Sequence, residues 1–119
     1  MIGLGTTALR IYAALEAQDL RKSFHGLTEI ALGHMAVQLS REALFVFCNR
    51  TRTRIKLLYF DGTGLWVATK RLEKGTFSWP KPSETGQKKL RLNPEALQLL
   101  LDGVDMRGGQ FKPWYERAS

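Results

Sequence analysis

The sequence predicts an α+β domain, in which an antiparallel four- to five-stranded meander sheet carries one long and one short helix. Apolar residues recur at helical spacing over residues 20–38 and at every second position after residue 44. The links between the later apolar stretches are too short for the crossover that parallel strands need. With 119 residues, of which 44% are hydrophobic, a single domain over 1–119 can bury a core without metal or disulfide.

The first two elements expected are a strand over 8–14 and a helix over 20–38. Ile11 and its neighbours favour the strand, although nearby alanines are also compatible with a helix. Asp19 is a good N-cap for the helix, because its side chain can accept a backbone hydrogen bond from the first turn. The apolar stripe of this helix consists of Leu20, Phe24, Leu27, Ala31 and Met35.

Four strands are expected next, joined by short links into a meander. They cover residues 44–48, 55–60 and 65–70 and, as a short strand, 76–79. The first is apolar at every position, which is typical of a central strand covered on both faces. It contains Cys48, the single cysteine, which cannot form an internal disulfide and is expected to be a small buried hydrophobe.

The remaining residues predict a loop, a second helix and a tail. Prolines and polar residues predict a mobile surface loop over 80–91. Asn93 followed by Pro94 is an N-cap with proline at the first helical position, so a short helix is expected over 94–102. The tail, 106–119, has no apolar periodicity and is expected to be irregular or partly disordered.

Positive charge is concentrated in the middle of the chain. The formal net charge is +7, from 18 Lys and Arg against 11 Asp and Glu. Residues 41–91 hold 12 of these basic residues and four of the acidic ones, whereas the two flanking segments are nearly balanced. If this segment folds as one sheet, the excess gives part of the surface a positive field suited to polyanions such as nucleic acids.

The candidate nucleic-acid contacts are cations in and around the predicted meander. They are Arg50, Arg52, Arg54, Lys56, Lys70 and Arg71, with Arg21 and Lys22 at the start of the first helix. The first four alternate along the chain, so an extended backbone would align them in a ladder about 20 Å long that matches a row of phosphates. A solvated basic edge without a ligand is the alternative, and Arg21 could instead pair with a carboxylate such as Asp61. Trp79, just before Pro80, is the ring most expected to be exposed for stacking on an unpaired base.

The residues indicate neither an enzyme nor a cofactor site. His25 and His34 are nine residues apart, which is not the spacing of two metal ligands on one helical face. Phosphate-loop and serine-nucleophile motifs are absent from the sequence. The carboxylates open to a small metal-dependent nuclease are Asp61, Glu73, Asp102 and Asp105. Each has a simpler expected role at a turn or a helix end, so we expect no catalysis, no metal and no cofactor.

The sequence also predicts a cytoplasmic protein without membrane association. Its longest apolar run, residues 43–48, is far shorter than the roughly 20 residues that a membrane-spanning helix needs. The first ten residues lack the basic and apolar regions of a secretory signal. The single cysteine agrees with a reducing compartment.

Five stretches of the sequence, taken in order, resemble a known protein family. They are DLRKSFHGL (19–27), LFVFCNR (44–50), RIK (54–56), DGTG (61–64) and KRLEKGTFSWP (70–80). Together they are similar to the TnpB-type accessory protein, encoded by the second open reading frame of bacterial insertion sequences of the IS66 family. The similarity extends from about Ile11 to Asp105.

This resemblance implies a bacterial accessory protein that assists transposition beside a separate and larger transposase. It also implies that the chain lacks the transposase's catalytic carboxylates. Two functions stay open at this point. The protein either binds DNA, at the element ends or as non-specific duplex, through its basic hairpin surface, or docks on the transposase without binding DNA. The oligomeric state also stays open.

Overall fold

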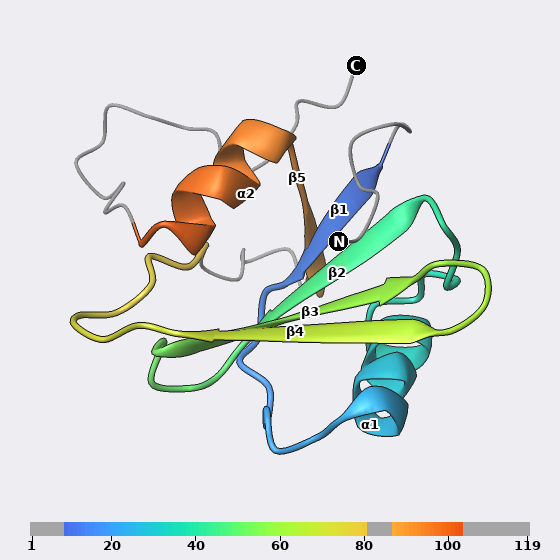
Figure 1. Cartoon of the computed structure of the whole chain (residues 1–119), viewed down its shortest axis with the longest axis horizontal. Coiled ribbons are helices and arrows are strands. Elements are labelled where there is room, and N and C mark those ends of the chain that lie inside the picture. The colour runs from blue at the N-terminus through green and yellow to red at the C-terminus, as the bar shows by residue number, and fades with distance from the viewer. Residues whose placement is uncertain (1–8, 81–86, 104–119) are drawn as a thin grey trace.

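The structure is a computed structural model that describes residues 9–80 and 87–103. Its strands form one sheet in the order β4-β3-β2-β1-β5 (Figure 1). The strands are β1 (Arg10–Ala14), β2 (Ala43–Cys48), β3 (Arg54–Phe60), β4 (Leu65–Arg71) and β5 (Lys89–Leu92). The helices are α1 (Phe24–Glu29), which continues into the π-helical turn η1 (Ile30–His34), and α2 (Pro94–Leu101). In Figure 1, α1 lies below the sheet and α2 above it.

The sheet confirms the predicted fold class, with one difference in strand direction. Strands β2, β3 and β4 form the expected antiparallel meander, and β5 pairs antiparallel with β1. Strand β1, however, pairs parallel with β2, with Ile11 opposite Leu44. The connection between these two strands contains α1, so it is long enough for the crossover that parallel pairing requires. The sheet is therefore mixed rather than wholly antiparallel.

The core lies on both faces of β2, which is buried at all six positions. Because side chains alternate along a strand, Leu44, Val46 and Cys48 join the core under α2, whereas Phe45 and Phe47 join the core under α1. The expected central strand and the expected buried cysteine are both confirmed. Burial also raises the pKa of the Cys48 thiol, which keeps the thiol protonated at neutral pH.

The first helix starts later than the sequence predicts. The expected range was 20–38, whereas α1 and η1 together cover 11 residues, 24–34. Asp19 is not the N-cap, which is Ser23. Instead, residues 19–22 form a separate turn, in which the Lys22 backbone N–H donates to the Asp19 carbonyl at 3.1 Å. This local turn competes with the helix for the same backbone groups.

The late start and the π-helical end also change which side chains the helix buries. Ala36 has a φ of 57°, a left-handed conformation that an α-helix cannot contain, so the helix ends before it. Phe24, expected in the buried stripe, is 43% exposed, and Leu32 is 44% exposed. Leu27 and Ala31 are fully buried, as expected.

The strand expected over 76–79 is not part of the sheet. Phe77 and Trp79 from this segment are nevertheless buried in the core under α2. The Phe77 backbone N–H donates to the Arg52 carbonyl at 2.7 Å, and the Trp79 indole N–H donates to the Ala14 carbonyl at 2.9 Å. The alternating aromatic residues therefore reflect packing in the core under α2 and not strand pairing.

The remaining strand, β5, lies within the segment 80–91 for which a mobile loop was expected. Leu90 and Leu92 alternate along it toward the core under α2, between polar residues that dominate the composition. The expectation was therefore wrong for the residues of β5. The rest of that segment from 81 to 86 and the tail 106–119 lie outside the described residues.

Helix α2 begins and ends close to its predicted bounds of 94–102. Asn93 is the N-cap, and its side-chain oxygen accepts from the Ala96 backbone N–H at 2.7 Å. Pro94 occupies the first helical position, where its missing N–H is not needed. Ala96 and Leu100 are fully buried against the sheet.

The turn between β3 and β4 is organised by the Asp61 carboxylate, as its expected role at a turn implies. One carboxylate oxygen accepts from the backbone N–H groups of Thr63 at 2.8 Å and Gly64 at 2.9 Å, and the other accepts from the Trp66 indole N–H at 2.8 Å. Gly62, with a φ of 101°, supplies the left-handed residue of the turn. These hydrogen bonds, that from the Thr63 backbone first among them, hold the pKa of Asp61 well below its usual range.

The Asn93 cap gives a prediction about stability. Replacing Asn93→Ala removes the side-chain acceptor, so the free energy of unfolding in urea should fall by about 1 kcal/mol. Asn93→Asp keeps an acceptor at the same position and should stay close to the original protein. Equal losses in the two variants would contradict the capping role.

The Asp61 turn gives a prediction about pH. A pKa lowered by folding stabilises the protein above the pKa of the unfolded carboxyl, and this stabilisation is lost as the pH falls toward the folded pKa. The unfolding free energy lost in Asp61→Asn should therefore be larger at about pH 7 than at about pH 3. Glu73→Gln, at an exposed carboxylate, is the control and should show little change. A loss in Asp61→Asn that does not vary with pH would exclude the carboxylate charge as its cause.

Candidate nucleic-acid interface

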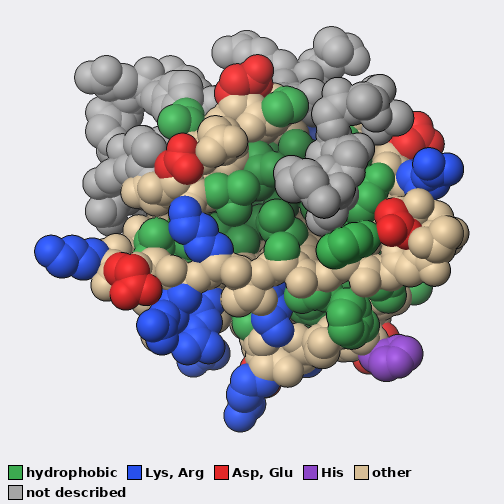
Figure 2. All heavy atoms as spheres, in the orientation of Figure 1, with side chains coloured by type: hydrophobic (Ala, Val, Ile, Leu, Met, Phe, Trp, Pro, Cys, Tyr) green, Lys and Arg blue, Asp and Glu red, His purple; other side chains and the backbone are tan. Residues whose placement is uncertain are grey.

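Basic side chains meet where β3 begins and β4 ends. Arg54 and Arg71 are directly opposite in the strand register and both are exposed. Lys56, two residues along β3, lies on the same face, and its ammonium group donates to the Lys22 carbonyl at 2.9 Å. In Figure 2, Lys and Arg side chains gather at the lower left, near this end of β4. The Lys22 side chain itself lies against Gly26 of α1 and does not join them. We call Arg50, Arg54, Lys56 and Arg71 the basic surface.

The link that precedes Arg54 is a tight turn held by the Asn49 side chain. The Asn49 oxygen accepts from the backbone N–H groups of Thr53 at 2.9 Å and Arg54 at 3.0 Å. Its amide nitrogen donates to the hydroxyls of Thr51 and Thr53. All the hydrogen-bonding groups of this side chain are therefore engaged in shaping the turn at residues 49–54.

The expected ladder of four cations is therefore wrong for its first two members. Arg50 and Arg52 lie in the turn and are not on the extended strand. Arg52 has a φ of 61°, and its guanidinium lies 5.8 Å from the centre of the Trp79 ring and beside Cys48. Its half-buried side chain packs inward, so we remove Arg52 from the candidate phosphate contacts.

The prediction that Lys70 belongs to the same surface as Arg71 is also wrong. It precedes Arg71 in β4, so the alternation of side chains puts it on the opposite face, toward α2. Its ammonium group donates to the Leu101 carbonyl at 2.6 Å, at the end of α2. A cation is favourable at a helix C-terminus, which explains this contact as a structural one.

The structure also contradicts the expected base-stacking role of Trp79. The ring is 8% exposed, and both its indole N–H and one of its faces have partners within the protein. The exposed tryptophan of the described residues is Trp66, at 47%, near the β3–β4 turn. Trp66 lies on the same face of β4 as the exposed Ala68, two residues along the strand.

Arg21 is paired, although not with Asp61 as suggested. Its guanidinium donates to both carboxylate oxygens of Asp19, at 2.9 and 2.8 Å. This pair lowers the pKa of Asp19 to about 2. The Arg21 side chain is 91% exposed, and its charge is largely balanced by its neighbour. We therefore treat Arg21 separately from the basic surface.

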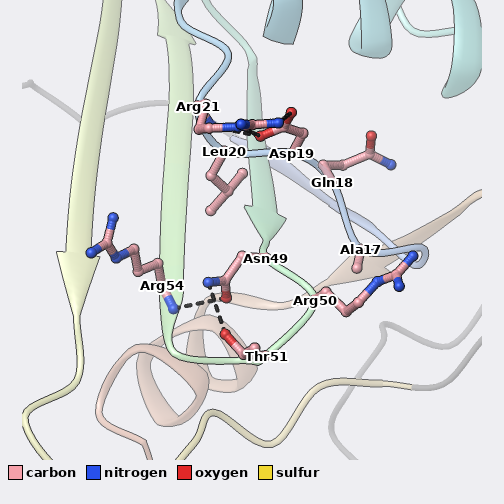
Figure 3. A pocket seen from close by; sticks show the side chains of 9 residues that line it. All are labelled: Ala17, Gln18, Asp19, Leu20, Arg21, Asn49, Arg50, Thr51 and Arg54. Carbon is pink, nitrogen blue, oxygen red and sulfur yellow. Dashed lines mark hydrogen bonds and ion pairs between the residues drawn. The ribbon is translucent and has the colours of Figure 1, made fainter.

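A pocket of about 510 Å³ opens beside the basic surface, between residues 17–21 and the turn at residues 49–54. In Figure 3 the Leu20 side chain lies between Arg21 and Asn49, with Arg54 and Arg50 on opposite sides. The wall of the pocket thus combines apolar side chains, Leu20 and Ala17, with guanidinium groups. No local pattern in the sequence predicts this pocket, because two segments far apart in the chain form it.

The described residues were also compared with what a metal site and a membrane-spanning helix require. In residues 9–80 and 87–103, no cluster of three or more His, Cys, Asp or Glu side chains is arranged to hold a metal ion. Over the same residues, every helix is too short or too polar to cross a bilayer.

Comparison with known proteins agrees with the resemblance noted in the sequence. The family model described as "IS66 Orf2 like protein" matches residues 9–110. The uncharacterized protein y4jC of Sinorhizobium fredii (strain NBRC 101917 / NGR234) is 33% identical over 113 residues, covering 95% of this chain and 93% of y4jC. The uncharacterized protein y4hO of the same strain is 32% identical over 102 residues, which is 86% of each chain. No solved structure matches the chain. The chain therefore belongs to the IS66 Orf2-like family, whose members are TnpB-type proteins of insertion sequences.

Proposed function

We propose that this protein is a non-catalytic accessory protein of transposition that binds DNA through the basic surface. The observation that carries the proposal is the direct opposition of Arg54 and Arg71 across β3 and β4. Like charges at opposite positions destabilise a sheet. Within the described residues no carboxylate forms an ion pair with Arg54, and the one ion pair of Arg71, to Glu73, is long at 3.9 Å and exposed. A polyanion placed over the two guanidinium groups relieves this repulsion.

The chemistry of the basic surface favours phosphates over base edges. Arg54 and Arg71 present planar forks of donors, which match the geometry of phosphate oxygens. The nearby amide of Asn49 is engaged in its own turn and has no free groups for reading a base. The proposed contacts therefore position the protein on DNA and give little sequence preference.

Docking on the transposase encoded by the same element is the second candidate function. The exposed apolar side chains of Phe24 on α1 and Leu32 on η1 favour it, because exposed apolar surface often marks a protein contact. These side chains lie on the helix, whereas Arg54 and Arg71 lie on the strands, so the two functions can be separated by substitution.

The DNA-binding proposal predicts a change in salt dependence. For Arg54→Gln/Arg71→Gln, the slope of log K against log salt on element-end duplex should become shallower by about 2, since each lost phosphate contact removes about 0.9. Arg10→Gln/Arg41→Gln is the matched control, because it removes the same charge at the opposite end of the sheet. The control slope should stay near that of the original protein. Equal slopes in both double variants would exclude the basic surface from binding.

The docking alternative has its own test. If it holds, Phe24→Ser/Leu32→Ser should lose capture of the purified transposase at high salt. Its salt slope on DNA should stay unchanged, because neither residue belongs to the basic surface. Capture that is undiminished in this variant would exclude the helix as the docking surface.

A further inference from the structure

We propose that the pocket beside the basic surface binds one unpaired nucleotide of the DNA, with its base stacked on the Arg21 guanidinium. The inference rests on the proposed DNA binding and deepens it, since it specifies a local structure of the DNA that the protein prefers. Three features of the pocket carry it: the fixed plane of Arg21, the apolar side chains in the wall, and the position of the other two guanidinium groups.

The Arg21 guanidinium is held in one orientation by Asp19, so it presents a planar face and not a free positive charge. Two parallel hydrogen bonds to the Asp19 carboxylate, at 2.9 and 2.8 Å, fix the orientation of the guanidinium plane. The same carboxylate balances the charge, while the side chain stays 91% exposed. An exposed guanidinium plane is a surface on which unpaired bases stack.

The pocket suits a base better than it suits a phosphate. Its volume of about 510 Å³ is within the range of small-molecule sites, which is roughly 300–1,000 Å³. Leu20 and Ala17 make part of its wall apolar, which a base face can contact and a phosphate cannot (Figure 3). An apolar base face loses nothing there, so a base is the part of a nucleotide that fits.

The other two guanidinium groups are placed for the adjoining backbone. Arg50 and Arg54 line the same pocket on its other sides, and both are exposed. With a base in the pocket, the phosphates on either side of its sugar lie at the edge, where these two cations can contact them. A regular duplex cannot use this arrangement, because its bases stay stacked inside the helix and cannot enter a pocket.

The recognition is expected to tolerate any base. Stacking on a guanidinium uses the face of the base, which all four bases have. The amide of Asn49 and the hydroxyl of Thr51 in the pocket wall are hydrogen-bonded to each other and to their own turn. The pocket therefore distinguishes unpaired from paired nucleotides and does not distinguish one base from another.

The test compares a DNA duplex that contains a single bulged 2-aminopurine with the same strand fully paired, at one ionic strength. The original protein should bind the bulged DNA about tenfold more tightly, in line with the stacking of one base. The fluorescence of 2-aminopurine should change on binding. In Arg21→Ala the affinity ratio should fall to about one and the fluorescence change should disappear.

Arg21→Lys separates stacking from charge, because lysine keeps the charge and has no planar face. It should also lose the preference for the bulge. A preference retained in Arg21→Lys would overturn the stacking account. Equal binding of bulged and paired DNA by the original protein, with a steep salt dependence, would overturn this inference and leave the proposed function intact. Failure to bind either DNA would remove the proposed function as well.

Discussion

The structure depends on the burial of β2 on both faces. A strand that is apolar at every position must be covered twice, and here α1 with η1 covers one face and α2 covers the other. Its two neighbours, β1 and β3, satisfy its backbone groups from either side. This arrangement fixes where β2 ends, and the turn held by Asn49 then sets where β3 begins. The position of Arg54, and with it the basic surface, follows from that turn.

The sequence predicts best those elements whose local pattern of apolar and polar residues fits only one kind of secondary structure. The buried β2, the meander through β4 and the cap of α2 by Asn93 all have local patterns that agree with their surroundings. The start of the first helix was misplaced because the residue type at Asp19 suits an N-cap, whereas in the structure Asp19 anchors a separate turn. Strand β5 was missed because two leucines among lysines and an arginine are a weak signal in so short a segment.

The sequence predicts the basic character of the candidate site better than it predicts where each basic side chain lies. Alternation assigns faces correctly within a strand, as it does for Arg54 and Lys56, but it does not continue through a turn. Arg52 has a left-handed backbone and turns inward, a conformation that no spacing of charges reveals. The opposition of Arg54 and Arg71 depends on the register of β3 against β4, which only the folded chain shows. The sequence therefore indicates a basic hairpin, whereas the folded structure decides which of its basic side chains lie together.

The central claim is that DNA phosphates contact the guanidinium groups at the start of β3 and the end of β4. The most direct measurement is an NMR titration of the arginine Nε–H signals with element-end duplex. The account predicts that the signals of Arg54 and Arg71 shift in a saturable way, while those of Arg10 and Arg41 at the far end of the sheet do not. Saturable shifts at Arg10 and Arg41, with none at Arg54 and Arg71, would contradict it.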